Sequence, residues 1–275
     1  MKQILVLTSV CCLLSTAFAV KTERWEVKTP AEFMRGKLQR LAVNGDGGLQ
    51  LGFNATKLGE FGKEIWCSTV TPDGTIFFGT GSPADVYAVG KDGKAAQVCQ
   101  TDAIAVSALV SDTKGNVFAA TLPEGKILKI GADRKASDFC RLRSSYVWAL
   151  AVDKDGALFA GCGPDGKIYR ISADGKAEEW YTAEDSNILC LAFDPADGAL
   201  LAGGSDRGLL YRVATKGKGS VLHEFAEDEV KALLVSGRDV FIAVNKQKAR
   251  RARTPSTTRK PNAGEFEDQI GRAHV

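Results

Sequence analysis

Histidine is scarce in this chain of 275 residues, with only two copies, His223 and His274. A serine or cysteine hydrolase needs a positioned base beside its nucleophile, and that base is most often histidine. Zinc centres commonly draw their nitrogen ligands from the same residue. The shortage therefore argues against both kinds of centre, and the sequence predicts no catalytic residue, no metal ligand and no cofactor.

Cysteine does not fill the gap. Five of the seven cysteines lie beyond the N-terminal segment, and they are Cys67, Cys99, Cys140, Cys162 and Cys190. An odd number argues against a full disulfide framework, and the chain has no CxxC pair that could begin a zinc site. We expect most of them to be small buried hydrophobic residues.

A long apolar run occurs only at the N-terminus, from Ile4 to Leu14. It follows Lys2 and precedes small residues up to Ala19, which predicts a secretory signal peptide over residues 1–19 and an exported chain, secreted or periplasmic. The run is too short to span a membrane as an ordinary helix. A lipoprotein anchor at Cys11 is disfavoured because Val10 stands where a small residue is needed.

Positive charge is concentrated in one segment. The chain carries a net charge of +3, but residues 246–263 contain seven Lys or Arg and no acid, so the remainder carries −4. Such a segment cannot bury a core, and residues 246–269 are predicted to be a disordered linker or loop. Nucleic-acid binding needs basic residues on folded elements, so no nucleic-acid partner is predicted.

Turn glycines recur at a nearly constant spacing. Gly74, Gly115, Gly156 and Gly198 stand 41, 41 and 42 residues apart, and Gly237 follows after 39. Residues 146–183 form the clearest unit, in which four short stretches of strand pattern alternate with turns that contain glycine. A period near 41 with four strands per unit predicts an all-β chain, a β-propeller of four-stranded antiparallel blades.

The repeat also predicts the boundaries of the blades. The propeller region covers residues 20–245, with whole blades at 63–101, 102–143, 144–183 and 184–226 and the start of a fifth at 227–245. Residues 37–61 resemble half a blade, and we expect them to belong to the blade that closes the ring. Residues 270–275 resemble a translated sequencing adapter, so we expect a non-native tail. Because only about five partly complete blades are present and rings of about six to eight blades need more residues, we expect an incomplete ring and an N-terminal portion of a longer protein.

Propeller ligands usually bind over the central channel, near the loops that precede the first strands and the loops that join second to third strands. The candidate binding residues in or beside these loops are Trp66, Glu124, Tyr146, Trp148, Asp165, Asn187 and Arg207. Trp66 and Trp148 stand eight residues before a turn glycine, as do Ser107 and Cys190. The two indoles predict either a stacking platform for a sugar or peptide, or packing between blades. Asp73, Asp155 and Asp197 precede turn glycines, and we expect them to cap their own turns.

The repeat lacks the dipeptides of WD repeats and the glycine pair of kelch repeats. The run D-x-D-G followed by two apolar residues and later by G-K-I-Y-R resembles the blades of exported bacterial propellers and of the sensor propellers of two-component regulators, within the superfamily of WD40-like and YVTN-like propellers. This resemblance covers about residues 33–244. It implies a recognition surface and no transferable catalytic residue.

The predicted function is therefore a binding or scaffold module that recognises a protein, peptide or carbohydrate ligand at the channel. One alternative is a propeller hydrolase, of the lactonase or polysaccharide-active type, that uses carboxylates with or without a bound calcium ion. Convergent carboxylates with strongly perturbed pKa values would favour this enzyme. Another alternative is a sensor ectodomain, which fold alone does not separate from a secreted binder.

Overall fold

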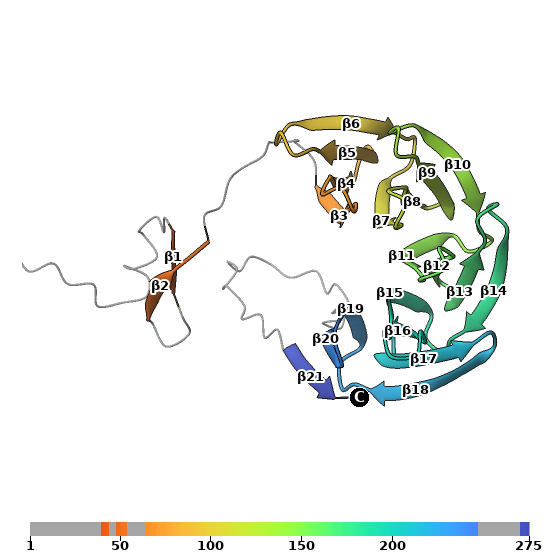
Figure 1. Ribbon diagram of the computed structural model, residues 1–275. Helices are drawn as coiled ribbons and strands as arrows, with labels where there is room; N and C mark the ends of the chain where they lie inside the picture. Colours follow the sequence, from red (N-terminus) through yellow and green to blue (C-terminus); the bar gives the residue numbers. More distant parts are fainter. Residues whose placement is uncertain (1–39, 44–47, 54–63, 247–269, 275) are drawn as a thin grey trace, which may run out of the picture. The chain divides into compact units, whose positions relative to one another are not determined.

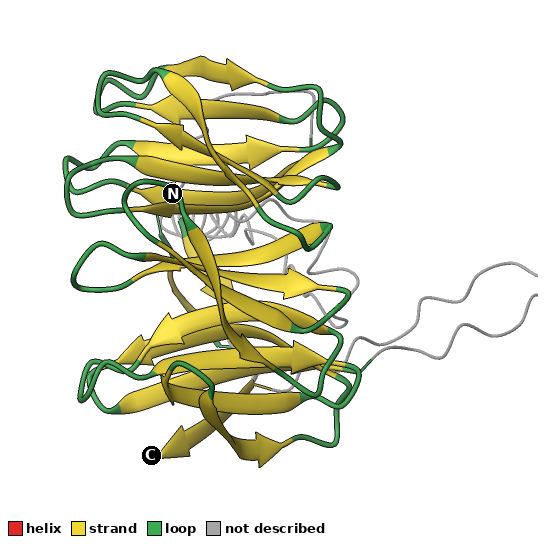
Figure 2. Cartoon of the chain, turned by 90° about the vertical axis from the view of Figure 1, so that its right-hand side faces the viewer, coloured by secondary structure: helices red, strands yellow, loops and turns green. Residues whose placement is uncertain are grey.

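The computed structural model describes residues 40–43, 48–53, 64–246 and 270–274. The chain forms two compact units, residues 1–57 and residues 58–275. Every regular element in the described residues is a β-strand, which confirms the prediction of an all-β chain (Figure 2). No helix in these ranges is long and apolar enough to cross a membrane. The predicted signal peptide and the predicted basic linker beyond Lys246 lie outside the described residues.

The first unit contains one described hairpin. Strand β1 (Leu41–Val43) pairs antiparallel with β2 (Leu49–Leu51), with Leu41 opposite Leu51. Its apolar side chains are largely exposed, since Leu49 is 57%, Leu51 88% and Phe53 99% accessible. The assignment of residues 37–61 to a closing blade stays a prediction.

The second unit begins with four antiparallel sheets of the same design. Each consists of four strands in sequence order, from first to fourth (Figure 1). Blade 1 comprises β3 (Ile65–Val70), β4 (Ile76–Thr80), β5 (Asp85–Val89) and β6 (Ala95–Gln100). Blade 2 comprises β7 (Ala105–Ser111), β8 (Val117–Leu122), β9 (Lys126–Ile130) and β10 (Ala136–Arg141). Blade 3 comprises β11 (Tyr146–Val152), β12 (Leu158–Gly163), β13 (Lys167–Ile171) and β14 (Ala177–Thr182). Blade 4 comprises β15 (Asn187–Phe193), β16 (Leu200–Ser205), β17 (Leu209–Thr215) and β18 (Lys218–Glu224).

A fifth blade is present in part. Strand β19 (Glu229–Ser236) pairs with β20 (Asp239–Asn245), and β20 pairs on its other side with β21 (Ile270–His274). One pairing, Ser205 opposite Glu229, joins β16 to β19, so that blades 4 and 5 count as one seven-stranded sheet. Residues 270–274 thus occupy a strand position, while the prediction that they are a non-native tail concerns their origin and stays a prediction.

The blades are arranged about a common centre, with an open side between blade 1 and blade 5 (Figure 1). Strands β3, β7, β11, β15 and β19 lie innermost, and each of the first four contacts the first strand of the next blade. The second strands β8, β12 and β16 are buried along their whole length, whereas every residue of the outer strand β18 is exposed. The described residues therefore form an incomplete propeller ring, as predicted.

Neighbouring blades pack through a large side chain set against a glycine. Ile188 on the first strand of blade 4 is fully buried, and a Cβ added at Gly161 of blade 3 would lie 2.7 Å from its side chain. Val106 against Gly79 and Val230 against Gly203 repeat the arrangement between other blades. Burying one such side chain contributes about 1.5–3 kcal/mol, so this repeated contact is a main source of cohesion between the blades.

The turns after the first strands are capped by aspartate, but the capping position differs between blades. Asp73 accepts the backbone N–H of Thr75 at 3.1 Å, and Asp197 accepts that of Ala199 at 3.0 Å, as predicted. In blade 3 the prediction of Asp155 is wrong, because Asp153 accepts the N–H groups of Asp155 and Ala157 at 2.9 and 2.8 Å. Asp153 occupies the first turn position, from which one carboxylate oxygen reaches both N–H groups.

All five cysteines of the described residues are free thiols. Cys162 and Cys190 are buried, and the other three are half-buried. Burial raises the pKa of Cys67 and Cys190 to about 12 and that of Cys140 to about 11. Because the thiolate is the nucleophilic form, these cysteines are packing residues rather than reactive ones.

Candidate binding site at the mouth of the ring

The mouth is the edge of the ring at which the first strands begin and the second strands end. Antiparallel pairing brings the two ends together in every blade, as in blade 3, where Tyr146 at the start of β11 lies opposite Gly163 at the end of β12. The loops before the first strands and those between second and third strands therefore share this edge. The predicted binding residues come from these loops and from the adjoining first strands.

Two aromatic rings form a stacked pair at the mouth. Tyr146 and Trp148, both on β11, have ring centroids 5.4 Å apart with an angle of 20° between the ring planes. Tyr146 is 37% exposed and Trp148 is half-buried. Residues two apart on a strand point to the same face, and the pairing of β11 with β12 is bulged at Trp148. The pair presents a rigid apolar surface with a polar edge.

The indole of Trp148 is held by the neighbouring blade. Its Nε1–H donates to Oδ1 of Asn187 at 3.0 Å, and Nδ2 of Asn187 donates to Oγ of Ser205 at 3.2 Å. This close approach requires glycine at position 163, because a Cβ there would lie 1.9 Å from Oδ1 of Asn187. The orientation of the platform is thus set before any ligand arrives, which lowers the entropic cost of binding.

The polar row continues into blade 5 through residues that the sequence analysis did not single out. Glu229 lies opposite Ser205 in the strand pairing, and its Oε2 accepts a hydrogen bond from Nδ2 of Asn245 at 3.4 Å. The Lys231 ammonium lies 3.5 Å from the same oxygen. Equivalence to Asn187 in the repeat was the available signal for Glu229, but the pairing of blades 4 and 5 was not visible in the sequence.

A buried carboxylate fixes the loop that carries Arg207. Asp185 is 1% exposed, and it accepts the backbone N–H of Arg207 at 2.7 Å and the hydroxyl of Tyr211 at 3.2 Å. Burial raises the pKa of the Asp185 carboxyl, and these hydrogen bonds oppose the rise. The Asp185 carboxylate therefore stabilises the loop, because its oxygens already accept hydrogen bonds from backbone N–H groups and a hydroxyl.

The charged residues among the predicted set make contacts of their own, and no hydrogen bond or ion pair in the described residues links them to the aromatic pair. Glu124, in the loop between β8 and β9, forms an ion pair with Arg141. Asp165, in the loop between β12 and β13, accepts the hydroxyl of Ser144 at 2.9 Å. The guanidinium of Arg207 pairs with Glu184 and, at 3.2 Å, with Glu224. The structure thus brings together three of the seven predicted residues, Tyr146, Trp148 and Asn187.

Trp66 occupies the place in β3 that Trp148 occupies in β11, as predicted, since each is the bulged residue of its strand. It is 50% exposed, and its Nε1 lies beside Gly81. The predicted equivalence of Cys190 is wrong. The bulge of β15 falls between Ile188 and Cys190, so Leu189 holds this position. The turn of blade 4 is one residue longer, which displaced the alignment on its glycine.

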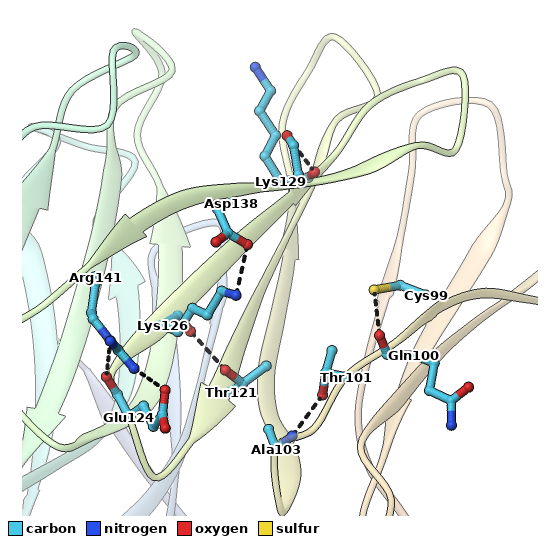
Figure 3. Close-up of polar contacts among 11 residues, drawn as sticks. Cys99, Gln100, Thr101, Ala103, Thr121, Glu124, Lys126, Lys129, Asp138 and Arg141 are labelled. Carbon is cyan, nitrogen blue, oxygen red and sulfur yellow. Dashed lines mark hydrogen bonds and ion pairs between the residues drawn. The ribbon is translucent and has the colours of Figure 1, made fainter.

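A cleft of about 400 Å³ lies between the outer strands of blades 1 and 2. Figure 3 shows two ion pairs at this cleft, Arg141 with Glu124 and Lys126 with Asp138, the latter at 2.8 Å, and Asp102 is a further carboxylate in its lining. The thiol of Cys99 also lines it, and burial raises the pKa of this thiol. The cleft therefore offers neither an activated nucleophile nor a pair of free carboxylates.

Catalytic geometry is equally weak at the mouth. The hydroxyl of Ser144 contacts Asp165, but His223 lies on the outer strand β18, where its ring packs against Phe225 with centroids 4.4 Å apart. In the described ranges no three His, Cys, Asp or Glu side chains gather closely enough to hold a metal ion. In the described residues the mouth combines aromatic and polar side chains.

Solved structures with the same fold include enzymes and a binding protein. Virginiamycin B lyase from Staphylococcus aureus aligns with a TM-score of 0.58 and 18% identity over 74% of this chain and 69% of that one. A streptogramin B lyase aligns with a TM-score of 0.59 and 19% identity, over 74% of this chain and 68% of the lyase. A chain of the nidogen–laminin complex aligns with a TM-score of 0.57 and 14% identity, over 66% of this chain and 72% of that one.

The fold is a β-propeller. At these identities the likeness extends to the fold and not to the activity or partners of those proteins. No protein-family model matches the propeller chain, and no curated protein matches its sequence. The role of this propeller must therefore be argued from its own surface.

Proposed function

We propose that this chain is an exported β-propeller binding module, and that its ligand binds at the mouth on the Tyr146–Trp148 pair. The carrying observation is the stacked pair itself, partly exposed and held from the next blade by Asn187 at 3.0 Å. Aromatic platforms that are rigid before binding are typical of recognition sites, because little rotamer entropy remains to be lost.

The ligand should present a flat apolar face with hydroxyl or amide groups at its edge. A sugar ring or a proline-containing or aromatic peptide has this character, and either could stack on the Tyr146 ring while reaching the polar row from Asn187 to Glu229. A catalytic role for the mouth is less well supported, since Glu124, Asp165 and Glu184 are each held by a partner side chain.

Glycan and peptide arrays test the proposal directly. The full-length chain is labelled and compared with Tyr146→Ser, which removes the exposed ring, and with Leu222→Ser, which removes a 39% exposed side chain of outer strand β18. We expect bound spots that survive Leu222→Ser and lose most of their signal with Tyr146→Ser. An array without any spot sensitive to Tyr146→Ser contradicts a site on this pair.

Export is tested separately. Residues 1–30 fused to a reporter phosphatase that is active only outside the cytoplasm should confer activity, because the apolar run from Ile4 to Leu14 acts as the signal. Replacing two leucines of the run by Arg should abolish this activity. Equal activity of both fusions would contradict the signal peptide.

A further inference from the structure

A second recess lies away from the mouth, between blades 3 and 4. This blade 3–4 groove has a volume of about 790 Å³ and is lined by Phe159, Trp180, Phe193, Arg170 and the turns 153–155 and 195–198. Both turns join a first strand to a second strand, so the groove lies at the opposite ends of the strands from the mouth. It is independent of the site proposed above.

Three aromatic rings form the apolar part of the groove. Phe159 is 3% exposed, and its ring meets Trp180 edge to face at 5.5 Å and Phe193 at 5.3 Å between centroids, with interplanar angles of 89° and 79°. Trp180 and Phe193 are half-buried. Edge-to-face contacts leave part of a ring face uncovered by its partner, and ring faces carry negative electrostatic potential.

The boundary between blades 2 and 3 has an equivalent arrangement with one ring fewer. Phe118 and Phe139 occupy the positions of Phe159 and Trp180, with centroids 5.0 Å apart. Val152 stands there in place of Phe193, since each ends its first strand opposite the start of the second. The Lys129 ammonium lies over both rings, at 5.9 and 6.0 Å from their centroids. This aromatic pair is therefore occupied by a cation from its own chain.

In the blade 3–4 groove the equivalent cation covers only part of the cluster. The Arg170 guanidinium lies 5.7 Å from the centroid of Trp180. Within the described part of the chain no cation lies over Phe193. An ammonium group of a ligand could occupy this ring as Lys129 occupies Phe118 and Phe139.

Carboxylates around the rings also favour a positively charged ligand. Asp153, Asp155 and Asp197 line the groove, against the cations Lys154 and Arg170. Arg170 is drawn toward Glu178, 3.6 Å away, and Asp197 is paired with Arg212. Asp153 accepts only backbone N–H groups at 2.8 and 2.9 Å, so its charge has no cationic partner in the described residues.

We propose that the blade 3–4 groove binds an organic ammonium ion, with Phe193 and Trp180 as walls, Phe159 as the floor and Asp153 and Asp155 at the rim. Ring faces and carboxylates both attract a cation, whereas a neutral ligand is attracted electrostatically by neither group. The ammonium group could belong to a free quaternary amine or to a methylated lysine of a peptide.

Calorimetric titration of the full chain with choline provides the first test, because 3,3-dimethylbutanol has the same shape without the charge. We expect choline to bind at least about tenfold more tightly than this isostere. Equal binding of the two compounds overturns the proposal. So does the absence of binding heat when choline is titrated to concentrations of tens of millimolar. This comparison uses the unaltered protein and does not depend on the folding of a variant.

Matched variants locate the site. Phe193→Val introduces the residue found at the same place in blade 3 and should weaken choline binding by about 5- to 30-fold. Phe139→Leu alters the neighbouring pair, and choline affinity should remain unchanged. Equal losses in both variants would place the bound choline elsewhere and contradict the assignment. Titration with a trimethyl-lysine peptide then distinguishes a free amine from a protein as the source of the ammonium group. If the ligand is a free amine, the flanking peptide residues should not increase the affinity above that of choline. If it is a protein, they should increase it.

Discussion

The indole N–H of Trp148 donates to Oδ1 of Asn187 over 3.0 Å, so that a side chain of blade 3 is oriented by a side chain of blade 4. Replacing Asn187 by Leu leaves this half-buried donor without its acceptor and should destabilise the fold by about 1–3 kcal/mol, measured by urea denaturation. In the double variant Trp148→Phe, Asn187→Leu both partners are apolar, and the cost should be smaller than the sum of the single costs. Strict additivity would contradict the coupling.

Gly166 is required by a close approach between two loops. Its φ is +61°, and a Cβ at this position would lie 2.0 Å from the carbonyl oxygen of Asp185. Gly156 has φ of +85° but no atom within 4 Å of such a Cβ, which makes it a matched control. Gly156→Ala should cost about 1–2 kcal/mol from backbone conformation alone, and Gly166→Ala about 1–3 kcal/mol more. Equal costs in thermal or urea unfolding would contradict the steric argument.

Asp73 should make stability depend on acid pH. Hydrogen bonds from Thr71 and Thr75 lower the pKa of this carboxyl to about 2 from an ordinary value of 3.8. The folded state binds the proton less tightly than the unfolded state, so the stabilisation is complete above pH 3.8 and is lost as the pH falls toward 2.

Asp73→Asn should therefore lower Tm at pH 7, and the difference from the unaltered protein should vanish near pH 2. Asp155→Asn is the control, because its carboxylate accepts no hydrogen bond in the described residues and the substitution should leave Tm unchanged at pH 7. A Tm difference for Asp73→Asn that is the same at pH 7 and near pH 2 would rule out the proposed linkage.

In blade 1, the side chains of Ile65 and Ile76 are more exposed than the residues at the same positions of blade 3. Ile65 is 55% and Ile76 36% exposed, whereas Val147 and Leu158 at the same places in blade 3 are 0% and 1% exposed. Ile76→Ala should cost less than about 1 kcal/mol, and Leu158→Ala about 2–5 kcal/mol. Urea denaturation of both variants makes the comparison.

A cost for Ile76→Ala as large as that for Leu158→Ala would mean that another segment covers Ile76 in solution.

The predictability of the candidate site differed from residue to residue. Tyr146 and Trp148 could be placed at the mouth because they lie within one strand, where the side-chain period of two fixes their common face. Asn187 could be placed there by its position in the next repeat. Its hydrogen bond to Trp148, however, depends on how two sheets pack, and no spacing within either strand specifies that distance.

The errors have the same origin. Alignment on turn glycines misplaced Cys190 by one residue, because the longer turn of blade 4 shifts the count while the bulge keeps Leu189 in the repeated position. The row from Ser205 to Glu229 escaped notice because it crosses from one blade to the next. Glu124, Asp165 and Arg207 lie in loops between second and third strands, but their ion pairs and hydrogen bonds are made with residues other than the aromatic pair.

By itself the sequence determined the all-β class, the four-stranded unit and the period of about 41 residues, because strand alternation and turn glycines are local properties of the chain. Only the tertiary structure decided which side chains act together, the Trp148–Asn187 pair at the mouth and the Phe159–Trp180–Phe193 cluster between blades 3 and 4. The physical reason is that both clusters are formed by contacts between sheets, and the repeat specifies each sheet far more strongly than the fit of one sheet against the next.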